Sequence, residues 1–250
     1  MLRLRFLLAA AAVLVLTACG TGPGAADRTL TVFAAASLTD PLTALAREFE
    51  AAHPGIAVDL GLAGSSDLVA QITEGAPADV VALADEPSLA PLVDAGLVPA
   101  DPPIIATNTL TIVAAPGAAA GVTGLADLAA PELSVVVCAP QVPCGAASRT
   151  VLDIAGVELT PVSEESKVTD VLGKVTSGEA DAGLVYVTDA RAAGDVVDVV
   201  AFPESAAAVN RYPAAVVADA AEPEAAQDFV DLLASEQGRR AFAAAGFGPP

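Results

Sequence analysis

Short apolar runs alternate with segments of helical periodicity from residue 29 to the end of the chain. Residues 29–34 form a run short enough for a buried strand, and Leu42, Leu45 and Phe49 then recur at the spacing of one helix face. Such alternation is typical of α/β proteins whose strands run mostly parallel. The predicted strands are 29–34, 56–62, 79–83, 110–114, 134–138, 182–187, 199–202 and 214–218. The predicted helices include 42–49, 64–72, 87–95, 145–155, 168–177, 223–233 and 236–245.

The alternating pattern is interrupted twice. It restarts at residues 102–108, and a polar, proline-containing segment at 211–213 breaks it again. Two interruptions of this kind indicate that the chain crosses twice between two lobes. We expect residues 29–107 and 214–250 to form one lobe and residues 108–213 to form the other.

The first residues have the features of an export signal. Arg3 and Arg5 precede an apolar run at 6–16 that is too short to span a membrane, and the sequence LTAC ends at Cys19. LTAC looks like a bacterial lipobox, in which the cysteine is lipidated and becomes the new N-terminus. We therefore expect a signal peptide at 1–18 and a lipid-anchored tether at 19–28, which would hold the protein on the outer face of the cell membrane. The alternative is an ordinary signal peptide with an incidental cysteine.

Two further cysteines, Cys138 and Cys144, lie in the sequence CAPQVPCG. An exported protein is in an oxidising compartment, so a disulfide between them is the expected state. The loop-entropy model gives such a loop of about seven residues roughly 2.4 kcal/mol of stabilisation. A metal site would need two more ligands, and a single histidine elsewhere does not supply them.

Composition and charge exclude several classes of function. The chain has 11 Lys and Arg against 31 Asp and Glu, a formal charge of −20, so the basic stripe that nucleic-acid binding needs is missing. His53 is the single histidine and lies in an HPG turn that we expect to be exposed to solvent. An exported serine hydrolase, the enzyme alternative, would have to use that residue and lacks a G-x-S-x-G elbow. A lipoprotein that binds only protein partners is a third possibility.

Small polar turns follow several predicted strands and begin helices. They contain Ser37, Ser65 with Ser66, Cys144, and the segment 166–168. Ligands of open α/β sheets bind beyond the carboxyl ends of strands, where helix N-termini offer unpaired N–H groups to an anion. Serine is also a common helix cap, so one such turn carries little weight alone. Four together favour an exported protein that binds an anion.

Seven segments in order resemble the molybdate-binding proteins of ABC transporters, and together they extend over nearly the whole chain from residue 29. The segments are TVFAAASL at 31–38, GSSDL at 64–68, GAPADV at 75–80, VPCG at 142–145, GLVY at 183–186, YPAAVV at 212–217 and GF at 246–247. The resemblance implies an α/β, two-lobed clamshell of the periplasmic-binding-protein type. It also implies that a tetrahedral oxyanion binds in the cleft between the lobes.

The resemblance also implies which residues bind the oxyanion. Ser37 and Ser65 would each offer a hydroxyl and a backbone N–H, Cys144 and Val168 a backbone N–H each, and Tyr186 its phenol O–H. By the same resemblance the protein is not an enzyme and needs no cofactor. Molybdenum or tungsten would enter only as molybdate or tungstate, and the partner would be an ABC permease. We expect the protein to be a monomer.

This sequence departs from the family pattern near the expected site. Cys144 replaces the usual alanine, which keeps the backbone donor, and Gly64 and Asp67 replace the more usual serine and threonine. A carboxylate beside an anion site is unfavourable, so Asp67 is expected to point away, at the start of its helix. Arg149 is expected on the surface of a helix, and Tyr212 is expected to pack at the hinge.

Donors without an acceptor favour fully ionised oxyanions. Molybdate, tungstate and sulfate carry no proton at neutral pH, whereas hydrogen phosphate carries one and needs an acceptor. Binding would then depend on short hydrogen bonds to a charged ligand in a dry cleft. Sulfate, which is smaller than molybdate, is the main alternative ligand.

Overall fold

The computed structural model describes residues 28–117 and 121–250. The expected signal peptide and the lipidation site Cys19 lie outside these residues. Within the described part of the chain, no helix has both the length and the apolar character needed to cross a membrane.

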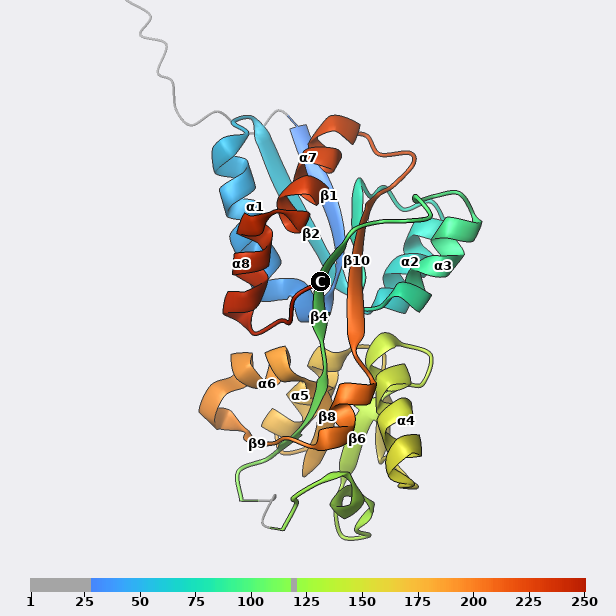
Figure 1. Ribbon diagram of the computed structural model, residues 1–250, viewed down its shortest axis with the longest axis vertical. Coiled ribbons are helices and arrows are strands. Elements are labelled where there is room, and N and C mark those ends of the chain that lie inside the picture. Colours follow the sequence, from blue (N-terminus) through green and yellow to red (C-terminus); the bar gives the residue numbers. More distant parts are fainter. Residues whose placement is uncertain (1–27, 118–120) are drawn as a thin grey trace, which may run out of the picture.

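Two five-stranded sheets form the centres of two lobes (Figure 1). The sheet of lobe 1 has the order β2-β1-β3-β10-β4, with β1 at Arg28–Ala35, β2 at Ile56–Ala63, β3 at Val80–Ala82, β4 at Ile104–Asn108 and β10 at Asn210–Val216. The sheet of lobe 2 has the order β7-β6-β8-β5-β9, with β5 at Leu110–Ala114, β6 at Val135–Cys138, β7 at Ser163–Glu165, β8 at Ala182–Tyr186 and β9 at Asp198–Val200. In each sheet one strand, β10 or β5, runs against the other four. The predicted α/β class with mostly parallel strands is therefore confirmed.

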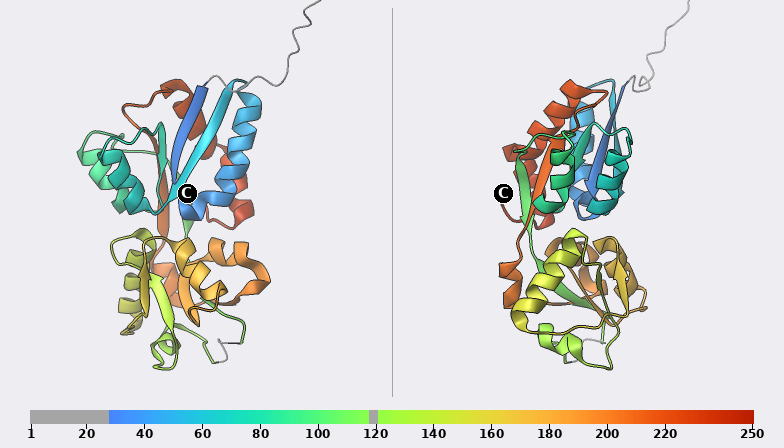
Figure 2. Two further views of the ribbon diagram at one scale, coloured as in Figure 1. Left: turned by 180° about the vertical axis from the view of Figure 1, so that it is seen from behind. Right: turned by 90° about the vertical axis from the view of Figure 1, so that its right-hand side faces the viewer.

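Helices cover both faces of each sheet (Figures 1 and 2). In lobe 1, α1 (Thr39–Ala52), α7 (Pro223–Ala234) and α8 (Glu236–Ala245) pack on one face, and α2 (Ser65–Thr73) and α3 (Glu86–Asp94) pack on the other. Alternate strand residues serve the two faces, since Val80 and Val81 belong to opposite cores. Lobe 2 contains α4 (Pro143–Ala155), α5 (Val168–Thr176) and α6 (Val187–Ala193).

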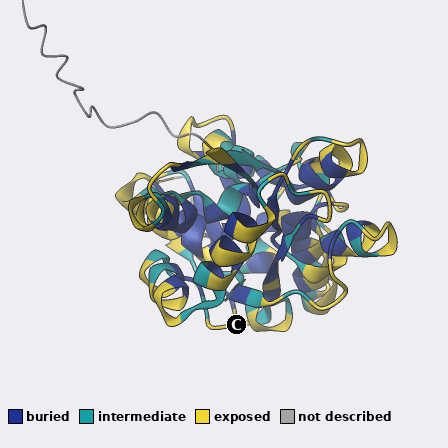
Figure 3. Cartoon of the chain, turned by 90° about the horizontal axis from the view of Figure 1, so that it is seen from above, coloured by how far each residue is buried: buried dark blue, intermediate teal, exposed yellow. Residues whose placement is uncertain are grey.

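The buried residues lie in the interior and the exposed residues follow the outer helices and loops (Figure 3). One face of each long helix supplies the buried side chains. In α1, Leu42, Leu45 and Phe49 are all buried, at the spacing that predicted this helix.

Adjacent strands β4 and β10 carry the chain between the lobes (Figure 1). β4 ends at Asn108, β5 begins in the other sheet at Leu110, and the chain returns to lobe 1 at Asn210. Asn210 is paired in register with Asn108, so two buried asparagines face each other where the lobes meet.

The structure corrects the start of one predicted strand by four residues and adds, besides short 3-10 turns, two strands and one α-helix. β10 begins at Asn210 and not at residue 214, because Pro213 lies at a shift in the pairing with β4 and does not end the strand. A proline has no N–H for the ladder, and an irregularity of this kind accommodates it. The strands β4 and β7 and the helix α6 were not predicted.

Candidate functional site

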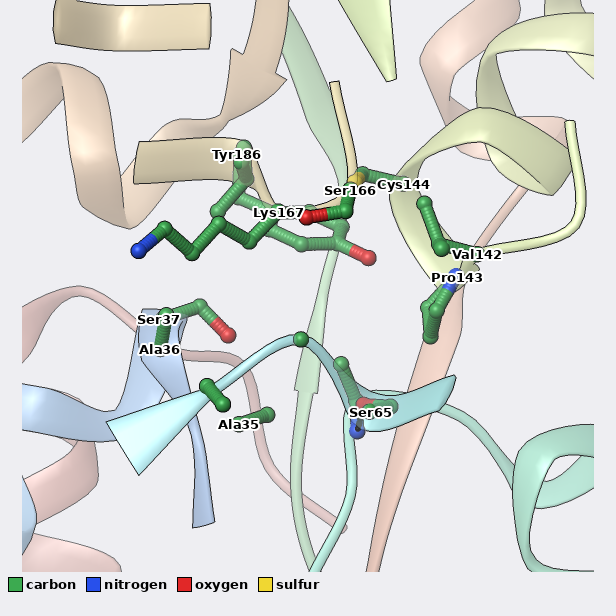
Figure 4. A pocket seen from close by; sticks show the side chains of 14 residues that line it. Ala35, Ala36, Ser37, Ser65, Val142, Pro143, Cys144, Ser166, Lys167 and Tyr186 are labelled. Carbon is green, nitrogen blue, oxygen red and sulfur yellow. Dashed lines mark hydrogen bonds between the residues drawn. The ribbon is translucent and has the colours of Figure 1, made fainter. Parts of the chain in front are cut away.

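A small pocket lies between the two lobes, and all five expected ligand-binding residues line it (Figure 4). Its free volume is about 20 Å³, against roughly 10–15 Å³ on the same measure for one water molecule, so as closed here it accommodates only a small solute. The lining residues are Ala35, Ala36, Ser37, Ala63, Gly64, Ser65, Ala84, Val142, Pro143, Cys144, Ser166, Lys167, Val168 and Tyr186.

Three helices begin at this pocket. Ser65 is the first residue of α2, Cys144 is the second residue of α4, and Val168 is the first residue of α5. The first N–H groups of a helix have no partner within the helix, and the helix dipole places positive charge there. The pocket can therefore attract an anion through backbone groups contributed by both lobes.

The hydroxyl of Ser65 is held by a backbone donor. Its Oγ accepts a hydrogen bond from the N–H of Ala84 at 3.0 Å, and the residue is buried. Because that N–H can only donate, the hydroxyl proton of Ser65 remains available to a ligand.

The hydroxyl oxygens of Ser37 and Tyr212 are hydrogen-bonded, 3.1 Å apart. Tyr212 is fully buried, and its ring packs edge-on against Tyr186 and Phe247. Tyr212 therefore has the packing role expected of it and also contacts an expected ligand-binding residue. When Tyr212 donates to Ser37, the proton of Ser37 is free for the pocket.

Tyr186 lies at the end of β8, on the opposite side of the pocket from Ser37 and Ser65 (Figure 4). Its hydroxyl oxygen accepts a hydrogen bond from Nδ2 of Asn210 at 3.0 Å. Burial raises the pKa of Tyr186 well above its usual range, so the hydroxyl keeps its proton. Asn210 was not among the expected site residues, because an asparagine between two lobes has no local sequence signal.

A disulfide joins Cys138 and Cys144, as the sequence predicted. It ties the end of β6 to the first turn of α4. Gly145 is needed there, because a Cβ at this residue would lie 1.8 Å from the carbonyl oxygen of Ala139. The first turn of α4 is thus packed directly on the loop that the disulfide closes.

Charged groups near the pocket are few and are directed elsewhere. Lys167 lines the pocket, and its side chain extends away from the Tyr186 hydroxyl (Figure 4), with Nζ 3.5 Å from a carboxylate oxygen of Asp170. Asp67 is exposed and does not line the pocket, but its Oδ2 lies 3.2 Å from where a Cβ of the pocket residue Gly64 would be, so the carboxylate turns back over the start of α2. Arg149 is exposed on α4, 3.9 Å from Asp153, and also lies outside the pocket.

A second, larger cavity lies next to the pocket, between α1 and α6, and contains two carboxyl groups. Asp189 is buried there and accepts a hydrogen bond from the N–H of Tyr186 at 3.1 Å; Asp40 lines the same cavity from lobe 1. Burial, together with the nearby Asp40, raises the pKa of Asp189 to about 7.

The lobes touch beside the pocket. A Cβ at Gly64 would lie 2.5 Å from the carbonyl oxygen of Ser166, so only a glycine permits this approach. Next to it, the hydroxyl of Ser66 donates to the carbonyl oxygen of Gln141 at 3.2 Å.

His53 lies at the end of α1 and does not reach the serines of the pocket. Its ring stacks on Phe49 and is half-buried, so His53 is less exposed to solvent than expected. Within residues 28–117 and 121–250, no cluster of His, Cys, Asp and Glu could hold a metal ion.

The family model described as "Bacterial extracellular solute-binding protein" matches residues 30–248. Among relatives, the molybdate-binding protein ModA of Mycobacterium tuberculosis is 45% identical, over 98% of this chain and 97% of its own length.

Two solved structures show the same fold. The periplasmic molybdate-binding protein of Azotobacter vinelandii matches with a TM-score of 0.76 at 24% identity, covering 88% of this chain and 99% of its own. The sulfate-binding protein SubI of M. tuberculosis matches with a TM-score of 0.74 at 26% identity, covering 89% of this chain and 87% of its own.

Proposed function

The chain belongs to the bacterial extracellular solute-binding proteins, and we propose that it captures molybdate or tungstate between its lobes and delivers it to an ABC permease. The observation that carries the proposal is the convergence of Ser37, Ser65, Cys144, Val168 and Tyr186 on one small pocket. The 45% identity to a molybdate-binding protein along nearly the whole chain supports the same ligand.

The chemistry of the pocket supports a ligand that only accepts hydrogen bonds. Three hydroxyl groups and the N–H groups of three helix starts are donors, and the partners of Ser65 and Tyr186 occupy the acceptor side of each oxygen. A molybdate dianion would receive charge-assisted bonds from both lobes, which are stronger than bonds between neutral groups. The protonated oxygen of hydrogen phosphate is itself a donor and would meet only donors in the pocket, so phosphate would form one hydrogen bond fewer.

Sulfate is the second candidate, because a sulfate-binding protein has the same fold at a TM-score of 0.74. When the lobes are closed, the donors are fixed in position, and all of them can reach an oxyanion at hydrogen-bond distance only if it has one particular radius. A smaller ion leaves some bonds long, so we place sulfate below molybdate.

We further propose that the protein acts as a monomer held to the outer face of the cell membrane by a lipid on Cys19. The segment from Cys19 up to β1 would be the tether, and the two lobes, which divide after β4 and again where β10 begins, would close on the ligand. A soluble protein released by an ordinary signal peptidase is the alternative.

Calorimetric titration of the purified protein with molybdate, tungstate, sulfate and phosphate tests the ligand. We expect molybdate and tungstate to bind most tightly and phosphate most weakly at pH 7. If phosphate outcompetes molybdate, the ligand assignment is wrong.

Single substitutions test the binding residues. Ser37→Ala, Ser65→Ala and Tyr186→Phe should each cost about 1.5–3 kcal/mol, roughly 10- to 150-fold in Kd, because each removes a bond to a charged acceptor. Arg149→Ala is the control, because this cation lies outside the pocket, and its Kd should be unchanged. Loss of binding in Arg149→Ala with normal binding in Ser37→Ala would refute a site made of neutral donors.

A further inference from the structure

Asn210 is buried where β10 begins, at the crossing between the lobes, and does not line the pocket. Its side-chain nitrogen Nδ2 lies 3.0 Å from the carbonyl oxygen of Ala84 and 3.0 Å from the hydroxyl oxygen of Tyr186. One amide group thus bridges lobe 1, through Ala84, and lobe 2, through Tyr186.

The carbonyl of Ala84 determines which way the amide is turned. A backbone carbonyl oxygen only accepts hydrogen bonds, so the amide atom beside it must be the NH₂ group. That nitrogen has two hydrogens, and its two partners lie at equal distances. The second hydrogen is therefore donated to Tyr186, whose oxygen must act as acceptor.

The direction of this bond sets what Tyr186 can offer. With its oxygen accepting from Asn210, the hydroxyl has its own proton left to donate, and the raised pKa keeps that proton in place. Tyr186 lines the pocket, so this proton, which the neighbouring Tyr212 hydroxyl can accept when no ligand is bound, can be donated to a ligand. A ligand that also carries a proton would find the acceptor side of Tyr186 already occupied.

The same network extends to Ser65. The N–H of Ala84 donates to Oγ of Ser65, and the carbonyl of Ala84 accepts from Asn210. Asn210 is therefore connected to one ligand-binding hydroxyl on each lobe while the lobes are together.

We propose that Asn210 is a positioning residue that fixes Tyr186 as a hydrogen-bond donor and so makes the site select oxyanions without a proton. The inference rests on the proposed function and assigns part of its selectivity to a residue that does not touch the ligand.

A double-mutant cycle tests the action through Tyr186. We expect Asn210→Ala to weaken molybdate binding at least 10-fold in the otherwise unchanged protein and less than 3-fold in the Tyr186→Phe background, measured by calorimetry. The residual loss reflects the unpaired carbonyl of Ala84. Equal losses in the two backgrounds would overturn the proposal, because Asn210 would then act on the hinge alone.

Selectivity is the second readout. Freed from Asn210, the oxygen of Tyr186 can accept the proton of hydrogen phosphate, so the ratio of molybdate to phosphate affinity should fall at least 5-fold in Asn210→Ala. Displacement of bound molybdate by phosphate at pH 7 measures this ratio. An unchanged ratio would overturn the proposal.

Asn108 supplies a matched control. It is buried and paired in register with Asn210, but its Nδ2 donates to Thr188 at 2.8 Å and not to Tyr186. Asn108→Ala should leave the ratio of molybdate to phosphate affinity unchanged. Any loss of molybdate affinity that it causes should be the same in the otherwise unchanged protein and in the Tyr186→Phe background. A fall in the ratio as large as that of Asn210→Ala would show that any change at the crossing relaxes selectivity, against the proposal.

An isosteric variant covers the case in which Asn210→Ala does not fold. Asn210→Asp keeps the shape, but an ionised carboxylate can only accept. It therefore loses the bond to Ala84, and Tyr186 would turn its proton toward the carboxylate and away from the ligand, so we expect binding at least 100-fold weaker. Asn108→Asp adds the same charge on the neighbouring strand and should lose much less. Equal losses in these two variants would refute the proposal.

Failure of the proposed function would appear separately, in the titration of the unchanged protein. If that protein prefers sulfate, the same cycle with sulfate still tests Asn210, since sulfate also carries no proton. If it prefers phosphate or binds no oxyanion, both proposals fall.

Discussion

Gly64→Ala should prevent the lobes from closing fully on the ligand. The glycine is buried at the start of α2, and its missing Cβ faces the carbonyl oxygen of Ser166 on the other lobe at 2.5 Å. Its φ of −65° is one that alanine adopts freely, so the substitution strains no backbone. The severe clash is between the lobes; within lobe 1 the new Cβ would lie 3.2 Å from Oδ2 of Asp67, an exposed side chain that can move.

The size of the effect follows from the distance. Ordinary contact between the new carbon and the Ser166 oxygen requires the lobes to part by about 1 Å, since packed interiors do not absorb such a shift. A hydrogen bond of 2.9 Å lengthened by that amount is no longer a bond. If the Tyr186 and Val168 donors are both weakened, affinity falls by about 2–4 kcal/mol, roughly 30- to 1000-fold.

Calorimetry and a thermal melt of the ligand-free protein give the two measurements needed. We expect the loss of affinity without a loss of stability, because the lobes can part without unfolding and Gly→Ala at a permissive φ stabilises by about 0.4–1 kcal/mol. Gly173→Ala in α5 is the control, with open space around its Cβ position and no expected change in Kd. Wild-type affinity in Gly64→Ala would refute the reasoning that this contact belongs to the ligand-bound form.

Three further predictions concern stability and anchoring. Burial raises the pKa of Asp189 to about 7, so the folded protein keeps a proton that the unfolded chain releases near pH 4. The free energy of unfolding therefore falls as pH rises from about 4 to 7. In denaturant titrations, Asp189→Asn should remove about 2–3 kcal/mol of that fall between pH 5 and 7. An identical pH slope in the variant would contradict this. Reduction of Cys138–Cys144 should lower the unfolding free energy by about 2 kcal/mol, and two alkylatable thiols in the unreduced protein would rule the bridge out in solution. Cys19→Ala should leave the protein unprocessed or release it from the membrane fraction, and a processed, membrane-bound product would refute lipid anchoring.

The fold could be predicted from the sequence where the hydrophobic pattern is regular. Leu42, Leu45 and Phe49 marked α1 because one helix face is buried, and β1 and β2 were marked by short apolar runs. β10 was placed too late because its first residues, Asn210 and Arg211, are polar and Pro213 resembles a break. Those residues are set by the crossing between lobes, which is a tertiary constraint without local periodicity.

The candidate site divides in the same way. Ser37, Ser65, Cys144, Val168 and Tyr186 were named from helix-starting turns and from ordered motifs, and the structure brings all five to one pocket. The partners that orient them were not named. Asn210 is 24 residues from Tyr186, so no spacing rule connects the two residues.

The placement of the aromatic residues gives the protein its own optical reporter. The chain contains two tyrosines and no tryptophan. Both tyrosines are fully buried, with ring centroids 6.1 Å apart; Tyr186 lines the pocket, and Tyr212 is hydrogen-bonded to Ser37, which also lines it. Ultraviolet emission should therefore originate almost entirely beside the proposed oxyanion site, so we expect that ligand capture can be followed in real time without a label or an engineered fluorophore.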